Sequence, residues 1–309
     1  MIVSPDIESQ HRCVLGEGPL WHPVNERLYV ADILTGSVIA LDAELNVLDT
    51  LAFGRATTAI TWQKDGALLC YHDRGAITRV SATGKWQSLM DCLPGEERGL
   101  FNDVIADSAG RVICGTQPVD GRAGRLYCVH RDLTWRVLLD DVQEPNGLGF
   151  SPDQRTLYFS DSGAQTIWRF EYDSRIGSLS DRRVFFRTHG EVLPDGLTVD
   201  AEGFVWAALW NGGAVVRIDP NGRIVRRIDV PATRTTSLTF GGPLCDTLYV
   251  TSARAEVTNA GDGLEDRGGA SFAFYGMGHG QPEFPSALGP LSGATAERPA
   301  QLHEPTSNC

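Results

Sequence analysis

Short apolar runs separated by glycine-rich turns recur along the chain, with a period of about 40 to 50 residues. Six of these runs are rich in Val, Ile, Leu, Tyr or Trp, and they lie at residues 27–32, 67–73, 111–116, 156–162, 204–210 and 247–252. Further apolar runs follow across a turn, as at 37–42, 124–130, 166–170 and 214–219. Enrichment in β-branched and aromatic residues between turns predicts strands, and no long segment shows a helical period.

The sixfold repeat predicts an all-β fold, a six-bladed β-propeller with a central channel, because radial closure of short sheets avoids long exposed edges. We expect residues 1–290 to form the propeller. The first 15 residues, including the run RCVL at 12–15, are expected to add an outer strand to the last blade and so close the ring. From about Ser286 the pattern is lost, and residues 291–309 are expected to form a flexible tail.

One position in each repeat falls at the predicted start of the innermost strand. A residue pair four apart aligns the repeats at Glu17, Thr58, Asn102, Asn146, Asp195 and Thr236, with spacings of 41, 44, 44, 49 and 41 residues. An isolated Asn-Gly or Asp-Gly usually marks a turn. Here the shared position favours a different interpretation, in which four acidic or amide side chains converge on the channel axis and the two threonines line its wall.

The four converging side chains, Glu17, Asn102, Asn146 and Asp195, offer two carboxylates and two amide oxygens. Oxygen donors of this kind suit one divalent metal ion, and two carboxylates facing a narrow channel without a cation would repel each other. The alternative is that the polar groups hydrogen-bond the rim of a water-filled channel. Ca²⁺ is the first expectation, but Zn²⁺, Mg²⁺, Mn²⁺ and Fe²⁺ accept the same donors.

Charge and composition narrow the classes of partner. The 309 residues carry a formal charge of −12 and a pI near 5.0, which disfavours nucleic acid and anionic membrane as partners. The chain begins without a secretory pattern and has no run of roughly 18 apolar residues, so we expect a cytoplasmic protein. Seven cysteines without a CxxC pair are expected to be reduced. A monomer and a homodimer both remain open.

Several motifs carry a family resemblance: EGPLW at 17–21, FNDV at 101–104, PNGLGFSPD at 145–153 and LPDGLTVDAEG at 193–203. In this order they resemble the SMP-30/gluconolactonase/luciferin-regenerating family, which includes regucalcin. The resemblance covers roughly residues 11–290. It implies a six-bladed propeller that binds a divalent ion and hydrolyses a small-molecule sugar lactone.

The resemblance also assigns roles to individual residues. It implies metal ligands at Glu17, Asn146 and Asp195, with Asn102 as a further ligand or a substrate contact. Asp195 of the Pro-Asp-Gly motif corresponds to the family's catalytic base. An acidic substrate contact falls on Asp120, shortly after the GTQ segment at 115–117. The ligands implied in this way coincide with those selected by the repeat alignment.

The chain departs from the family pattern at Leu100, where many sugar-lactone members carry an arginine that would contact the substrate. Arg98, two residues earlier, could replace that arginine only if the loop shifts. An arginine suits a hydroxyl-rich or anionic substrate, so its loss allows a more apolar ring at this position. Alternatively, Leu100 only packs at the channel mouth.

These features predict a metal-dependent hydrolase that opens a sugar lactone to the aldonic acid, with Asp195 as the base and the ion as the electrophile. One alternative is hydrolysis of a more apolar lactone, an aryl ester or an organophosphate. An alternative of another class is a non-catalytic propeller that serves as a binding scaffold. No HExxH zinc motif or GxSxG nucleophile motif is present in the sequence.

Overall fold

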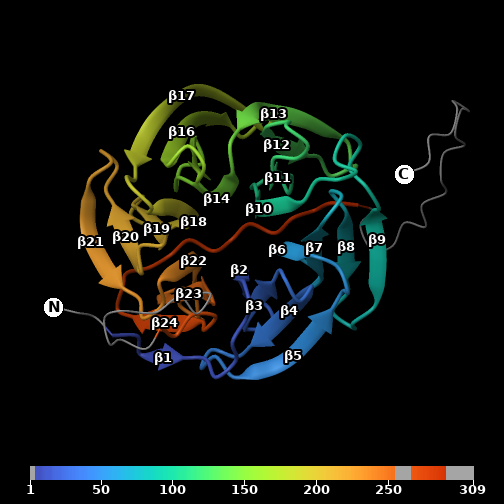
Figure 1. Ribbon diagram of the computed structural model, residues 1–309. Coiled ribbons are helices and arrows are strands. Elements are labelled where there is room, and N and C mark those ends of the chain that lie inside the picture. The colour runs from blue at the N-terminus through green and yellow to red at the C-terminus, as the bar shows by residue number, and fades with distance from the viewer. Residues whose placement is uncertain (1–3, 255–265, 290–309) are drawn as a thin grey trace, which may run out of the picture.

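The computed structural model describes residues 4–254 and 266–289, and every regular element in these two ranges is a β-strand. Twenty-four strands form six four-stranded sheets, arranged as blades around a common axis (Figure 1). Neighbouring strands within each blade are antiparallel. The predicted six-bladed β-propeller is therefore confirmed.

The strands of each blade follow one another from the axis outward. Blade 1 consists of β2 (Gly16–His22), β3 (Arg27–Asp32), β4 (Ser37–Leu41) and β5 (Val47–Ala52). Blade 2 consists of β6 (Thr57–Trp62), β7 (Leu68–His72), β8 (Ile77–Val80) and β9 (Trp86–Met90). Blade 3 consists of β10 (Phe101–Ala106), β11 (Val112–Thr116), β12 (Gly124–Val129) and β13 (Trp135–Val142). Blade 4 consists of β14 (Pro145–Phe150), β15 (Thr156–Asp161), β16 (Thr166–Asp173) and β17 (Ser178–Arg187). Blade 5 consists of β18 (Leu193–Val199), β19 (Val205–Trp210), β20 (Ala214–Ile218) and β21 (Ile224–Asp229). Blade 6 consists of β22 (Arg234–Gly241), β23 (Thr247–Ala253), β24 (Phe272–Tyr275) and β1 (Ile7–Glu8). The six predicted middle strands are β3, β7, β11, β15, β19 and β23.

The ring is closed by the N-terminal segment. Each innermost strand contacts the innermost strands of the two neighbouring blades, and β2 contacts β22. Strand β1 pairs with β24 and forms the outer edge of the last blade. The prediction that the first 15 residues supply this outer strand is confirmed, but the strand itself is β1, and residues 12–15 instead lead inward to β2.

The hydrophobic core is divided into six clusters, each between the facing surfaces of adjacent blades. Leu20 of blade 1, for example, packs in one cluster with Ile60 of blade 2. At the seam between blades 6 and 1, the rings of Trp21 and Tyr249 stack with their centroids 5.8 Å apart. Because neighbouring blades cover both faces of the inner and middle strands, these strands are apolar on both sides.

A local irregularity marks the beginning of every innermost strand. In all six blades the pairing of the first and second strands shifts register there, next to or at the residue selected by the repeat alignment. A Cβ on Gly147 would lie 2.2 Å from the backbone nitrogen of Leu197, and one on Gly196 would lie 2.0 Å from the Ser237 hydroxyl. These two glycines therefore permit close approach of adjacent blades and do not form turns.

Residues 279–289, here called the strap, cross the axis at the end where the innermost strands finish (Figure 1, the red segment). The Gln281 side chain donates to the carbonyl of Val199 at 3.3 Å, and the Trp62 indole donates to the carbonyl of Glu283 at 3.0 Å. The backbone of Ala287 donates to Gly110 at 2.8 Å. The strap thus joins blades 2, 3 and 5 across one end of the propeller.

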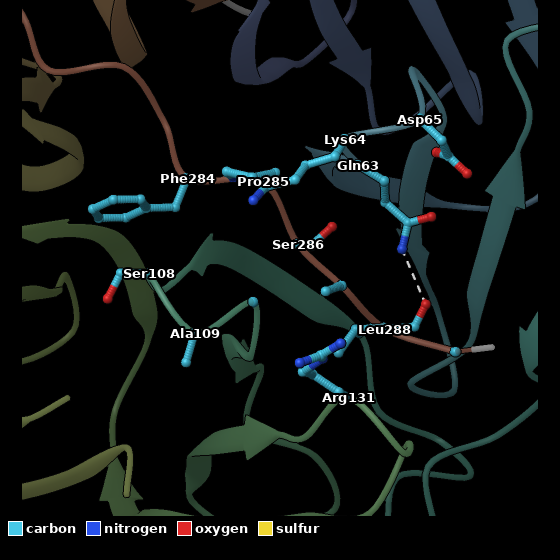
Figure 2. A pocket seen from close by; sticks show the side chains of 13 residues that line it. Gln63, Lys64, Asp65, Ser108, Ala109, Arg131, Phe284, Pro285, Ser286 and Leu288 are labelled. Atoms are coloured by element: carbon cyan, nitrogen blue, oxygen red, sulfur yellow. Dashed lines mark hydrogen bonds between the residues drawn. The ribbon is translucent and has the colours of Figure 1, made fainter. Parts of the chain in front are cut away.

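The end of the described chain is packed against the propeller. Figure 2 shows residues 284–288 beside Gln63, whose side-chain amide donates to the carbonyl of Leu288 at 3.0 Å. Leu288 is 2% exposed and belongs to the core between blades 2 and 3. The loss of pattern from Ser286 therefore does not mark the end of packed structure. The predicted tail at 291–309 lies outside the described residues. In the two described ranges, no helix is long and apolar enough to cross a membrane.

Candidate functional site

The six residues selected by the repeat alignment all lie near the beginning of an innermost strand, at the end of the propeller opposite the strap. Glu17, Asn146 and Asp195 are buried, whereas Asn102 is partly exposed. The pKa of Glu17 responds to the charge of Asp195, although the two residues come from blades 1 and 5. The fold therefore brings the predicted acidic and amide ligands together around the axis.

The two amide residues belong to a hydrogen-bond network that runs across three blades. Asn102 Nδ2 donates to Asn146 Oδ1 at 3.0 Å and to the carbonyl of Pro145 at 2.6 Å. Asn146 Nδ2 donates to Ser162 Oγ at 2.9 Å, and Ser162 Oγ donates to the carbonyl of Pro194 at 2.6 Å. Because both N–H groups of Asn102 are used, its Oδ1 is the group available to an ion or a substrate hydroxyl.

The carboxylates of the site are strongly perturbed. Burial raises the pKa of Glu17 well above its ordinary value, and the charge of Asp195 raises it further. Burial likewise raises the pKa of Asp195, and the charge of Asp103 adds to that shift. Asp195 Oδ1 is buried and has no hydrogen-bond partner among the described residues. Negative charge in such surroundings is costly unless a proton or a cation neutralises it.

The donor set fits a hard divalent cation. Glu17 and Asp195 supply carboxylate oxygens, Asn146 is oriented by Ser162, and the unpartnered Asp195 Oδ1 is a buried acceptor ready for a ligand. Carboxylate and amide oxygens with a formal charge of −2 suit Ca²⁺ and similar ions. Glu17, Asn146, Asp195 and Asn102 could therefore hold the expected metal ion.

Asp103 is a further acidic residue of the site that the repeat alignment missed. It follows Asn102 directly, is 9% exposed, and burial raises its pKa to about 7. The equivalent position in the other repeats holds a small residue: Gly18, Ala59, Gly147, Gly196 and Ser237. A carboxylate among five small residues was the available sequence signal.

Glu283, on the strap, is a further acidic residue near Asp103. Burial, followed by the charge of Asp103, raises the pKa of Glu283 to about 7. The strap segment carries no strand pattern, and its position depends on contacts with distant blades. Its sequence therefore contains no local signal that would have placed Glu283 here.

The remaining predicted residues, Leu100, Asp120 and Arg98, lie on loops at the end of the propeller where β10 begins. Leu100 is partly exposed, and its backbone carbonyl accepts a hydrogen bond from Gln117 at 2.9 Å. Arg98 Nη1 lies 3.0 Å from Asp120 Oδ2, and both side chains are largely exposed. The structure thus pairs Arg98 with the predicted substrate contact Asp120.

Two acidic residues, each at the end of a middle strand, hold the backbone segments that lead into the site. Asp161 accepts hydrogen bonds from the backbone of Gln143 at 3.2 Å and of Glu144 at 2.9 Å, just before Asn146. Asp32 accepts equivalent bonds from the two residues before Gly16, both at 3.1 Å. These carboxylates hold the segments that enter β14 and β2.

Comparison with known proteins finds relatives that match this chain along most of its length. The SMP-30/Gluconolactonase/LRE-like region matches residues 15–254. Pentonolactonase XacC of Haloferax volcanii is 41% identical over 279 residues, which are 89% of this chain and 95% of that protein. A 6-deoxy-6-sulfogluconolactonase of Pseudomonas putida is 34% identical over 246 residues, which are 78% of this chain and 84% of that protein.

A solved structure shows the same fold. The regucalcin of Agrobacterium tumefaciens, described as a calcium-binding protein, superposes with a TM-score of 0.80 at 27% identity. The superposition covers 94% of this chain and 98% of the regucalcin. The motifs, the six blades and the matched region agree, and this chain belongs to the SMP-30/gluconolactonase/LRE-like family.

Proposed function

We propose that this chain is a metal-dependent lactonase that opens a sugar lactone to the corresponding aldonic acid. The observation that carries the proposal is the convergence of Glu17, Asn146 and Asp195 at one end of the propeller, with Asp195 Oδ1 buried and without a partner among the described residues. The lactonase names of two relatives support this reaction class.

The ion would be held by Glu17, Asn146 and Asp195, with Asn102 Oδ1 as a further ligand or a substrate contact. When bound, it supplies positive charge that polarises the ester carbonyl and stabilises the oxyanion. We propose Ca²⁺, in keeping with the calcium-binding description of the Agrobacterium tumefaciens regucalcin. Ser162 keeps the carbonyl oxygen of Asn146 available by accepting a hydrogen bond from its amide.

Asp195 acts as the general base. As the water oxygen bonds to the carbonyl carbon, the Asp195 carboxylate accepts one water proton. When the bond between that carbon and the ring oxygen breaks, the ring oxygen takes the proton held by Asp195, which restores the base, and the aldonic acid is released. Burial raises the pKa of Asp195, which makes it a stronger base than an exposed aspartate, and a neighbouring cation opposes this shift.

Arg98 and Asp120 provide polar groups for the substrate at the mouth. Their ion pair offers a donor and an acceptor next to the loop that carries Leu100. In the proposed complex the pair contacts lactone hydroxyls and compensates for the arginine absent at position 100. Because both side chains are largely exposed, they can exchange their mutual contact for contacts with a ligand.

A substrate panel at fixed metal concentration tests the proposal. Pentono- and hexonolactones are compared with an apolar lactone, an aryl ester and an organophosphate, and we expect the sugar lactones to be hydrolysed fastest. Arg98→Ala should raise KM for sugar lactones with little change in kcat. Arg223→Ala, in an exposed turn of blade 5, is the matched control. No lactone turnover by metal-loaded protein would contradict the proposal and favour a binding scaffold.

A further inference from the structure

A second group of metal-ligating side chains lies at the seam between blades 6 and 1. The chain leaves β1 at the outer edge of blade 6 and crosses inward to β2, the innermost strand of blade 1. His11 and Cys13 lie on this crossing, and Asp32 ends β3. A ring nitrogen of His11, Cys13 Sγ and a carboxylate oxygen of Asp32 all lie within 4.8 Å of one another.

Two of these residues have donor atoms that are buried and available. His11 Nε2 is buried and has no hydrogen-bond partner in the ranges that the structure describes. Cys13 is 2% exposed and is a free cysteine. A buried ring nitrogen without a partner reduces stability unless a ligand or a proton donor satisfies it. His11 of the cluster therefore carries an unsatisfied ring nitrogen, and a bound cation is one way to satisfy it.

The backbone around the cluster is held in place. The backbone N–H of Cys13 donates to the carbonyl of Gly269 at 2.8 Å. The two carboxylate oxygens of Asp32 accept hydrogen bonds from Val14 and Leu15, both at 3.1 Å. A carboxylate has about four acceptor positions, so contact with an ion leaves both of these bonds intact. Two of the three side chains thus project from fixed backbone.

We infer that His11, Cys13 and Asp32 form a binding site for a divalent cation of the Zn²⁺ class. Imidazole, thiolate and carboxylate are the side-chain ligands that Zn²⁺ uses, and the fourth position is left to water. The donor set differs from the all-oxygen set in the channel, so the two sites select different ions. An ion at the seam joins the N-terminal crossing to blade 1 and stabilises closure of the ring.

Binding exchanges a proton for the ion. Burial, followed by the charge of Asp32, raises the pKa of Cys13 to about 12, so the free thiol is protonated at neutral pH. When the ion binds, the S–H bond is replaced by a bond from sulfur to the metal and the proton passes to solvent. No oxidant or reductant takes part.

The test uses the full chain, stripped with a chelator and then given excess Ca²⁺ to fill the channel site. Cd²⁺ is titrated in as the probe, and the thiolate-to-Cd²⁺ charge-transfer absorption is recorded. A Cd²⁺ ion among channel oxygens gives no such band. We expect a band that saturates at one Cd²⁺ per chain and that Zn²⁺ removes by competition.

Three variants assign the site. Cys70→Ala is the matched control, because Cys70 is also buried and free, and it should retain the band. Cys13→Ala should abolish the band. His11→Ala, which changes a partly exposed residue and so keeps the test valid if Cys13→Ala fails to fold, should weaken binding at least tenfold. No band in the wild type, a band retained by Cys13→Ala, or unchanged binding by His11→Ala would overturn the three-residue site.

Discussion

Blades 2 and 6 carry threonine at the position where blades 1, 3, 4 and 5 carry a carboxylate or an amide. Thr58 Oγ1 donates to the carbonyl of Asn102 at 3.4 Å, and Thr236 Oγ1 donates to the carbonyl of Gly16 at 2.5 Å. Asp195 Oδ1, in contrast, has no partner within the described part of the chain. A short hydroxyl thus joins the backbone of the next blade, whereas Asp195 Oδ1 is left available for the proposed ion.

Replacing Asp195 by asparagine should have the largest effect, because the variant retains the shape and a metal-binding oxygen but loses the proposed base. We expect kcat for a sugar lactone to fall by about 10²–10⁴-fold at saturating metal. Steady-state kinetics measures the loss. Thr236→Ser, at the equivalent position of blade 6, should remain close to the wild type. An Asp195→Asn enzyme with more than a tenth of the wild-type kcat would disprove the proposed role.

Glu17→Gln should mainly weaken binding of the metal ion. It removes one of the two formal charges of the proposed ligand set, so we expect Ca²⁺ affinity to fall by about 100-fold. Isothermal titration calorimetry with chelator-treated protein measures the change. Thr58→Ser in blade 2 serves as the control and should bind Ca²⁺ as the wild type does. Equal affinities in Glu17→Gln and the wild type would place the ion elsewhere.

Ser162→Ala should have an intermediate effect, because it releases the amide of Asn146 without removing a ligand. Loss of such an orienting partner typically lowers metal affinity by about 10- to 100-fold, and excess metal should restore most of kcat. Ser160→Ala is a suitable control, since Ser160 is equally buried in the same blade and its hydroxyl has no partner among the described residues. Similar affinities for both variants would argue against the orienting role.

Glu283→Gln tests the strap end of the channel through pH. Burial raises the pKa of Glu283 from 4.5 to about 7. Between these values the folded chain holds a proton that the unfolded chain has released, so the free energy of unfolding falls as pH rises. The variant should match the wild type at or below pH 4.5 and exceed it by about 3 kcal/mol above pH 7. Urea denaturation at several pH values checks this, and a parallel pH dependence of both proteins would contradict it.

Thr236→Val should have the smallest effect. It removes the hydrogen bonds to the Gly16 carbonyl and the Thr251 hydroxyl and should lower the free energy of unfolding by about 2 kcal/mol, with Ca²⁺ affinity unchanged within about twofold. Urea denaturation and calorimetry measure the two quantities. A large loss of Ca²⁺ affinity would mean that the threonine takes part in the metal site, which would remove the distinction between the two groups of blades.

The blades could be predicted from the sequence because each repeat carries its own strand pattern and turns. The middle strand β3, for instance, coincides with the predicted run at 27–32. The strap could not be predicted in this way. Its course depends on partners that are distant in sequence, such as Trp62 and Gly110, while its own residues show no strand periodicity.

The residues of the site likewise fall into those that the sequence could locate and those that it could not. Glu17, Asn146 and Asp195 could be located because equivalent repeats place equivalent residues around one axis. Asp103 was missed because the alignment used one position per repeat, whereas the irregular pairing of β10 and β11 affects two consecutive residues. Ser162 was missed because its contact with Asn146 depends on how β14 and β15 meet in space.

The most direct test of the central claim measures bound metal and sugar-lactone hydrolysis in the same samples, before and after chelation and after addition of Ca²⁺. We expect activity to disappear with the channel ion and to return when Ca²⁺ binds to the proposed ligands Glu17, Asn146 and Asp195. Asp195→Asn should stay inactive even when loaded with metal. Full activity of the chelated wild type, or of metal-loaded Asp195→Asn, would contradict the account.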